Sequence, residues 1–288
     1  MPRRAWLPYL FLALFAAVLS IASAPRAFAA DAKCEPEKLS AKYPSLVGKT
    51  FKLAMTVDTR PLGFRDPNNL DHIMGFSIDQ ANAAFACIGI PKEVMIAPFS
   101  GALSALTSGQ ADVLWGSLFY TPERAKVVDL IIYMRGASAG VVQKGNPKNL
   151  NGLDDLCGKR ATAVVSGIEA IKLRDTNAAC LAANKPGLEI TLSPDRPSAM
   201  RLIDADRADL YLGIGMRQGY DDTRYTVAFV YVNNLKTGIG LQKNGNKELE
   251  KAILEALTIM HGAGTDKALL SKYEIDPNLA LPPELIVE

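Results

Sequence analysis

The stretch FSGALSALTSGQADVLWGSLFYTPERAK, residues 99–126, contains the alternation of helix and strand on which the fold assignment rests. Its first part predicts a short helix that Ser100 can cap and Gly109 can end. The apolar run ADVLWG then predicts a buried strand, and the chain breaks at Gly116-Ser117. The segment TPER predicts the start of another helix. Helix, strand and helix in succession are typical of α/β units.

The TPER segment also contains the first candidate for a binding residue. Thr121 is typical of an N-cap and Pro122 of a first helical position, so Arg124 is expected in the first turn. The helix dipole is positive there, and a cation is unfavourable unless an anion approaches it. Arg124 is therefore a candidate anion-binding residue. The alternative is a surface ion pair with Glu123 or Asp129.

The same alternation extends on both sides of this stretch and then repeats. In the segment 75–89, Ser77 and Gln80 match a capping box and Gly89 is typical of a helix end. Alternating strands and helices predict an α/β protein with a mainly parallel sheet. The predicted strands are 50–57, 93–97, 111–116, 158–167, 188–193 and 208–215, and the predicted helices are 75–89, 99–110, 168–184, 196–207 and 246–264.

These elements form two similar halves with two junctions, at 133–146 and 231–246. Each junction contains glycines and ends in a strand followed by a Lys-Gly-Asn or Lys-Asn-Gly-Asn turn. The second junction implies that the helix at 246–264 returns to the first half. Two halves joined by two crossings form a cleft, where small ligands commonly bind.

The N-terminus predicts export. Arg3 and Arg4 precede a long apolar run that ends in the cleavage pattern Ala27-Phe28-Ala29, so residues 1–29 are interpreted as a signal peptide. A transmembrane anchor is the alternative. Removing this segment takes three of the 32 basic residues and none of the 30 acidic ones, which leaves a net charge close to zero. Nothing in that charge favours nucleic acid as a partner.

The four cysteines all follow the predicted signal peptide, and an even number in an oxidising compartment indicates two disulfides. Three pairings are open, of which the sequence-local one joins Cys34 to Cys87 and Cys157 to Cys180. A zinc site is the rival interpretation, although no CxxC motif occurs. With only two histidines in the chain, we expect no metal site and no cofactor.

The chain resembles the periplasmic solute-binding proteins of polar-amino-acid ABC transporters, known as family 3. The segments that carry the resemblance are GFSIDQANAAF, residues 99–133, KGNPKNLNGLDDLCGK, SGI, ADRADLYL and IGLQKNGNKELEKAILEALTIMHGAG. The resemblance implies a two-lobed Venus-flytrap fold of type II, with two hinge crossings. It places lobe 1 at 30–140 and 238–288 and lobe 2 at 141–237. It also implies a monomer in the periplasm that delivers a small ligand to a permease in the inner membrane.

The resemblance further implies roles for individual residues. Arg124 matches the arginine that clamps the ligand's carboxylate, and Ser117 matches a second carboxylate contact. Asp58 matches an acid that often meets the ligand's amino group. Ser166, Gly167 and Ile168 match the strand-to-helix turn of the second lobe, whose N–H groups face ligand anions. For Ser117 the alternative is a turn residue, and for Asp58 it is a loop-capping side chain.

Several positions depart from the family pattern. Phe119 stands where relatives place a hydroxyl group, and Ile214 where they place an aspartate for the ammonium group. Leu62 replaces a stacking phenylalanine, and Arg60 is an additional cation close to Asp58. The pattern therefore predicts a small organic anion that depends little on an α-amino group. A shifted alignment, or compensation by Asp206 or Asp209, is the alternative.

Three functions compete. The first is a transport receptor for an amino acid or related small carboxylate, which is not an enzyme. The second is an enzyme on the same scaffold, similar to cyclohexadienyl dehydratases, for which Asp58 and Glu169 are the available acid–base groups. The third is a periplasmic receptor that reports its ligand to another protein.

Overall fold

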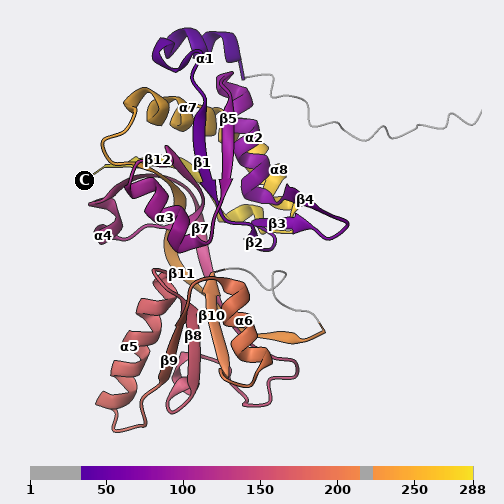
Figure 1. Cartoon of the computed structure of the whole chain (residues 1–288), viewed down its shortest axis with the longest axis vertical. Helices are drawn as coiled ribbons and strands as arrows, with labels where there is room; N and C mark the ends of the chain where they lie inside the picture. Colours follow the sequence, from indigo (N-terminus) through magenta and orange to yellow (C-terminus); the bar gives the residue numbers. More distant parts are fainter. Residues whose placement is uncertain (1–33, 215–222, 288) are drawn as a thin grey trace, which may run out of the picture. The chain divides into compact units, whose positions relative to one another are not determined.

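A computed structural model describes residues 34–214 and 223–287 of the chain (Figure 1). The predicted signal peptide lies outside the described residues. Within the described ranges, no helix combines the length and the apolar character that a membrane span requires. The strands are β1 (Phe51–Met55), β2 (Asp58–Thr59), β3 (Gly63–Asp66), β4 (Asn69–Met74), β5 (Lys92–Ile96), β6 (Val113–Phe119), β7 (Val128–Gln143), β8 (Arg160–Val164), β9 (Glu189–Ser193), β10 (Leu210–Ile214), β11 (Tyr225–Gln242) and β12 (Ala280–Ile286).

One nine-stranded sheet has the order β5-β1-β6-β11-β7-β10-β8-β9, with β12 paired to β7. Strand β1 is parallel to β5 and β6, and β8 is parallel to β9 and β10. The central strands β7 and β11 are antiparallel to each other and to β10 and β6. The sheet is thus mixed rather than mainly parallel, because these two strands run in opposite directions between the halves. A separate small sheet, β2-β3-β4, was not expected from the sequence.

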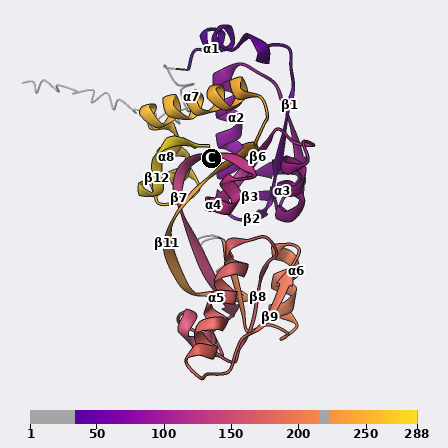
Figure 2. The ribbon, with the colours of Figure 1, turned by 90° about the vertical axis from the view of Figure 1, so that its left-hand side faces the viewer.

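Helices cover both faces of the sheet in each half. In the first half, α2, α7 and α8 pack over one face of the sheet, and α3 and α4 pack over the other (Figures 1 and 2). In the second half, the sheet packs against α5 and α6. The apolar face of α7 is buried at Leu249, Ile253, Leu257 and Met260. The helices are α1 (Pro36–Lys42), α2 (Phe76–Ile88), α3 (Phe99–Thr107), α4 (Pro122–Ala125), α5 (Ile168–Ala182), α6 (Arg196–Asp204), α7 (Lys247–Ala263) and α8 (Thr265–Lys272).

Strands β7 and β11 are the two crossings between the halves, and Figure 2 shows them side by side. They pair from Gln143 opposite Tyr225 to Val128 opposite Gln242, and the register is irregular between Val232 and Lys236. The chain boundaries predicted for the lobes, at 140/141 and 237/238, fall within these two strands. Those boundaries stay a prediction.

Some of the helix caps and ends predicted from the sequence are confirmed, and others are wrong. The predicted N-cap of α4 is confirmed, because the Thr121 hydroxyl accepts a hydrogen bond from the backbone N–H of Arg124 at 3.2 Å. Gly89 ends α2 in the left-handed conformation that glycine favours. The capping box at Ser77 and the cap at Ser100 are wrong. Helix α2 follows Gly75 and α3 follows Pro98, and neither has a side-chain cap.

The backbone explains why Ser77 is not a cap. The N–H of Ser77 donates to the carbonyl of Leu62 at 2.9 Å, so a loop carbonyl supplies the acceptor that a capping side chain would offer. Gly75 adopts φ 131°, and a Cβ atom there would lie 2.5 Å from the Leu62 oxygen. This close approach of two backbone segments requires glycine and moves the helix start forward.

Two disulfides are present, one in each half. They join Cys34 to Cys87 and Cys157 to Cys180, which is the sequence-local pairing. The first links the segment before α1 to α2, and the second links the turn before β8 to α5.

Replacing either cysteine pair by serine is expected to lower the free energy of unfolding by about 2–4 kcal/mol. The loss should be larger for Cys34 and Cys87, because their separation of 53 residues exceeds the 23 between Cys157 and Cys180. Urea unfolding of the two double variants and the oxidised native protein measures the difference. Equal stability of all three proteins would contradict a stabilising role for the bridges.

Candidate ligand-binding site

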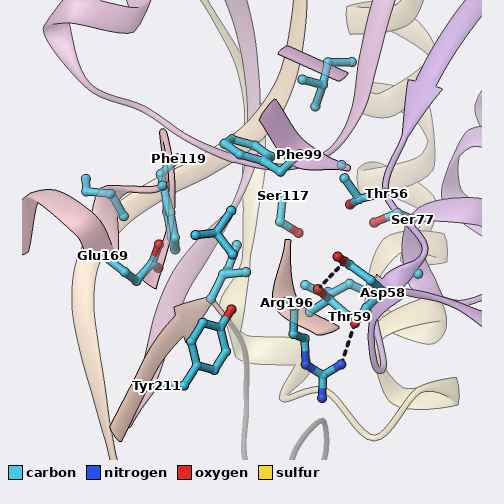
Figure 3. Close-up of a pocket in the computed structure, with 18 of the residues that line it drawn as sticks. Thr56, Asp58, Thr59, Ser77, Phe99, Ser117, Phe119, Glu169, Arg196 and Tyr211 are labelled. Carbon is cyan, nitrogen blue, oxygen red and sulfur yellow. Dashed lines mark hydrogen bonds between the residues drawn. The ribbon is translucent and has the colours of Figure 1, made fainter. Parts of the chain in front are cut away.

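A pocket lies where the carboxyl ends of β1 and β6 approach the start of α5 and of α6 (Figure 3). Both halves of the chain line it. Hydrophobic side chains make up much of the wall, and four arginine and acidic side chains are set among them. The lining residues that bear on function are Asp58, Leu62, Phe99, Ser117, Phe119, Arg124, Gly167, Ile168, Glu169, Arg196, Tyr211 and Ile214.

Arg124 lines the pocket from α4. Its guanidinium donates from Nη1 to the carbonyl oxygen of Phe119 at 2.8 Å and from Nη2 to that of Ser166 at 2.6 Å. It also lies 5.7 Å from the ring centroid of Phe99. Burial lowers the pKa of Arg124, and the carboxyl group of Glu169 acts in the opposite direction. The two carbonyls hold the guanidinium in place, and its remaining N–H groups can bind an anion.

Ser117 lies on β6, and its hydroxyl oxygen is buried in the wall of the same pocket. Among the described residues this oxygen has no hydrogen-bond partner. A buried polar atom without a partner costs free energy, and a ligand atom that bonded to it would remove that cost. The position is thus suited to a polar ligand contact.

Asp58 stands on β2, just beyond the end of β1. Its carboxylate accepts a hydrogen bond from the Thr59 hydroxyl at 3.0 Å. Its backbone oxygen accepts another from Arg196 Nη1 at 2.6 Å, and Figure 3 shows both bonds at the pocket's edge. The carboxylate can accept further bonds from a ligand.

The turn from β8 into α5 lines the pocket through Gly167 and Ile168, the N-cap and the first residue of α5. Ser166 adopts a left-handed conformation with φ 66°. It does not line the pocket itself. Its carbonyl instead holds Arg124 from the second half of the chain.

Of the four positions that depart from the family pattern, three line the pocket and one does not. Phe119, Ile214 and Leu62 all line the pocket, so its wall is apolar at these three places. Arg60 is not among the lining residues, and its guanidinium lies 4.2 Å from the centroid of the Phe64 ring.

The acids considered as substitutes at the ammonium position also lie elsewhere. Asp206 and Asp209 form ion pairs with Arg160, at 2.9 and 2.6 Å, and neither lines the pocket. Trp115, which precedes Gly116 and Ser117 on β6, is buried in the core of the first half. Its indole N–H donates to Gln80 Oε1 at 3.3 Å.

Sequence reasoning missed Arg196, Tyr211 and Phe99, and considered Glu169 only as an acid for an enzyme. Arg196 is the first residue of α6, after the N-cap Asp195, whose side chain accepts from the N–H of Ser198 at 2.7 Å. That capping pattern predicts the helix start, but it does not indicate that the arginine faces a pocket. In the described ranges, no three His, Cys, Asp or Glu side chains converge as a metal site would require.

Two α/β halves, two crossing strands and a pocket lined by both halves define a periplasmic-binding-protein fold of type II. The chain belongs to the family described as bacterial extracellular solute-binding proteins, family 3, whose sequence profile matches residues 51–275. Among curated relatives, the L-cystine-binding protein TcyJ of Escherichia coli K12 is 25% identical over 70% of this chain and 74% of its own length. The arginine-binding extracellular protein ArtP of Bacillus subtilis is 28% identical over 43% of this chain and 47% of its own.

Solved structures agree on the fold. An ancestral arginine-binding protein bound to arginine superposes with a TM-score of 0.67 and 25% identity, over 78% of this chain and 97% of that one. The amino-acid-binding protein AbpA of Streptococcus pneumoniae, bound to L-arginine, gives 0.67 at 18% identity, over 82% and 97%. The ancestral amino-acid-binding protein AncCDT-1, a precursor of cyclohexadienyl dehydratase, gives 0.66 at 22%, over 82% and 98%.

Proposed function

We propose that this protein captures an amino acid or a related small carboxylate in the periplasm and delivers it to an ABC permease in the inner membrane. It acts as a monomeric binding protein rather than an enzyme, after removal of residues 1–29. The observation that carries the proposal is the guanidinium of Arg124, fixed by two carbonyls in an otherwise largely apolar pocket. The curated relatives named above are binding proteins for amino acids, which supports the same role here.

In this proposal Arg124 pairs with the ligand's carboxylate, because a planar guanidinium offers two parallel donors to two carboxylate oxygens. Ser117 adds a hydroxyl contact, and the N–H groups at Gly167 and Ile168 add the positive end of the α5 dipole. Asp58 is a half-buried carboxylate that can meet a positive group on the ligand. Phe119 and Ile214 pack against its apolar part.

Closure around the ligand follows from the two crossings. We assign lobe 1 to residues 30–140 and 238–288 and lobe 2 to residues 141–237. A bend in β7 and β11 then moves one lobe against the other. The irregular register between Val232 and Lys236 supports a bend at that level, because the ladder hydrogen bonds there are already interrupted.

A thermal-shift screen of amino acids and small carboxylates tests the binding role. A ligand at 100 times its Kd should stabilise the native state by about 2.7 kcal/mol, and calorimetric titration then gives the affinity. The screen includes L-cystine and L-arginine, the ligands of the named relatives. Product analysis after prolonged incubation separates a binding protein from an enzyme. Conversion of a bound acid would contradict the proposal, and so would the absence of any ligand.

A further inference from the structure

Glu169 is the acidic residue in the pocket that the proposed function leaves without a role. It is the second residue of α5, its side chain is 5% exposed, and it lines the pocket. Figure 3 shows its carboxyl group directed into the pocket. A carboxyl group at this depth is either neutral or paired with a cation, because an unpaired buried carboxylate costs several kcal/mol.

Its contacts do not provide a cation. One carboxyl oxygen, Oε1, accepts a hydrogen bond from the hydroxyl of Ser138 on β7 at 2.8 Å. Among the described residues Glu169 forms no ion pair: the guanidinium of Arg124 acts on it through its charge but makes its hydrogen bonds to two backbone carbonyls. The second oxygen, Oε2, lies close to Gly167: a Cβ atom added to that glycine would be 3.1 Å from Oε2.

Opposing effects act on the ionisation of this group. Burial raises the pKa of Glu169, whereas the Ser138 hydroxyl, its own backbone N–H and the charge of Arg124 lower it, and burial prevails. The other titratable or charged groups that line the pocket are Tyr211 on β10, Arg196 on α6 and Asp58 on β2. Neither histidine lines it.

The charge of Glu169 decides the charge of the whole site. Two arginines and two carboxylates sum to zero when Glu169 is ionised, which matches a zwitterionic amino acid. When Glu169 is protonated, the lining side chains sum to plus one, which matches a monoanion. A protonated carboxyl group can also donate a hydrogen bond to a ligand oxygen, which a carboxylate cannot.

We propose that Glu169 is an uncharged carboxylic acid in the working pocket and a specificity-determining residue, which makes the site select monoanionic carboxylates over zwitterionic amino acids. This inference rests on the proposed function, since it assigns the ligand class of the same pocket. The apolar side chains of Phe119 and Ile214, which offer an ammonium group neither a charge nor a hydrogen bond, support the same choice.

The protonation state can be measured without a ligand. The mature protein carries glutamate labelled with ¹³C at the side-chain carboxyl carbon, and its NMR spectrum is followed against pH. The Glu169 resonance is the one absent from the Glu169→Gln variant. We expect its midpoint to lie above the ordinary value of about 4.3 and above the pH of the binding assays. A midpoint below the assay pH would overturn the inference and leave the binding role intact.

Matched ligands test the consequence. Calorimetric titration compares 3-phenylpropanoate with L-phenylalanine, and 4-methylpentanoate with L-leucine, each pair differing only in the amino group. The native protein should prefer the des-amino acid by about tenfold or more, and its affinity should fall as pH rises through the Glu169 midpoint. Glu169→Gln, a neutral donor of the same shape, should keep that affinity within about threefold and lose the pH dependence, whereas Glu169→Ala should weaken binding.

Asp175→Asn is the control for an acid-to-amide change on the same helix, because Asp175 is exposed on α5. It should behave as the native protein does. Preference for the amino acids, with a loss of about tenfold or more in Glu169→Gln, would mean that an ionised Glu169 holds the ammonium group, and would overturn the inference. If the native protein binds none of the compounds in the larger screen, the proposed function fails, whatever the titration of Glu169.

Discussion

Replacing Arg124 with alanine is expected to weaken ligand binding by about 2–5 kcal/mol and to leave the fold intact. The variant removes a charge-assisted and bidentate contact from a pocket whose wall is largely hydrophobic. It also removes the hydrogen bonds to Phe119 and Ser166, the second of which joins the two halves. The fold should persist, because the Thr121 cap of α4 uses the backbone N–H of residue 124 and not its side chain. Calorimetric titration of the best ligand from the screen measures the loss, and circular dichroism checks the fold.

Arg124→Lys distinguishes charge from geometry. An ammonium group cannot span two carbonyls and a carboxylate as the planar guanidinium does, so binding by this variant should also be poor. Lys126→Ala is the matched control, since it removes an exposed cation next to the same helix. Native affinity in Arg124→Ala would show that the guanidinium is not the carboxylate anchor.

The largest expected effect on stability concerns Asp129, a buried carboxylate on β7. Its oxygens pair with Lys243 at 3.0 Å and with Lys247 at 2.6 Å, and Lys247 also pairs with the buried Glu250 at 3.0 Å. Replacing both lysines with methionine leaves two buried carboxylates without a cation. We expect this double variant to lose about 3–5 kcal/mol of unfolding free energy.

Removing the carboxylate itself should cost less. Lys243 and Lys247 are 24% and 51% exposed, so their ammonium groups can reach water when Asp129 is replaced by asparagine. Urea unfolding of Asp129→Asn, of the double methionine variant and of the control Lys251→Met, an exposed lysine on α7, gives the order. A larger loss in Asp129→Asn than in the double variant would contradict this account.

The same network predicts how stability depends on acidity. Burial raises the pKa of Asp129, but hydrogen bonds from Lys247 and Lys243 outweigh it, so the folded-state pKa lies below its ordinary value. The stabilisation is therefore complete above the unfolded-state pKa of about 3.9 and is lost as pH falls through the lower folded value. The native protein should lose more stability over that acidic range than Asp129→Asn does.

The sequence predicted the regular elements of the fold because their signals are local. Strand β6 begins with a buried apolar run, and α7 repeats apolar residues at helical spacing. The break predicted at Gly116-Ser117 is wrong, because β6 continues through both residues to Phe119. The small β2-β3-β4 sheet lacked such a signal, since β4 is largely exposed and carries Asp71 and His72. Strand β12 contains two consecutive prolines, which argue against a central strand but are tolerated beside β7 at the edge.

The candidate site was predicted only in part, for a similar reason. Arg124 and Ser117 lie in a motif whose position along the chain could be matched to relatives. Arg196 follows an ordinary helix cap, and only the approach of α6 to β2 brings it to the pocket. In the sequence, Glu169 resembles any acidic residue in the first turn of a helix. Its place in the pocket depends on burial against Ser138, which lies 31 positions earlier in the chain.

The route of the chain through β7, β11 and β12 also bears on how the protein is synthesised. The core of the first half contains Ile239, Leu249 and Ile275, and β12 pairs with β7 from Ala280 onward. This half therefore cannot complete its sheet until nearly the whole chain is available. The strands of the second half are all present once residue 242 has been made. Although domains commonly fold in order from the N-terminus during translation, here the middle of the polypeptide is expected to acquire its structure before its beginning.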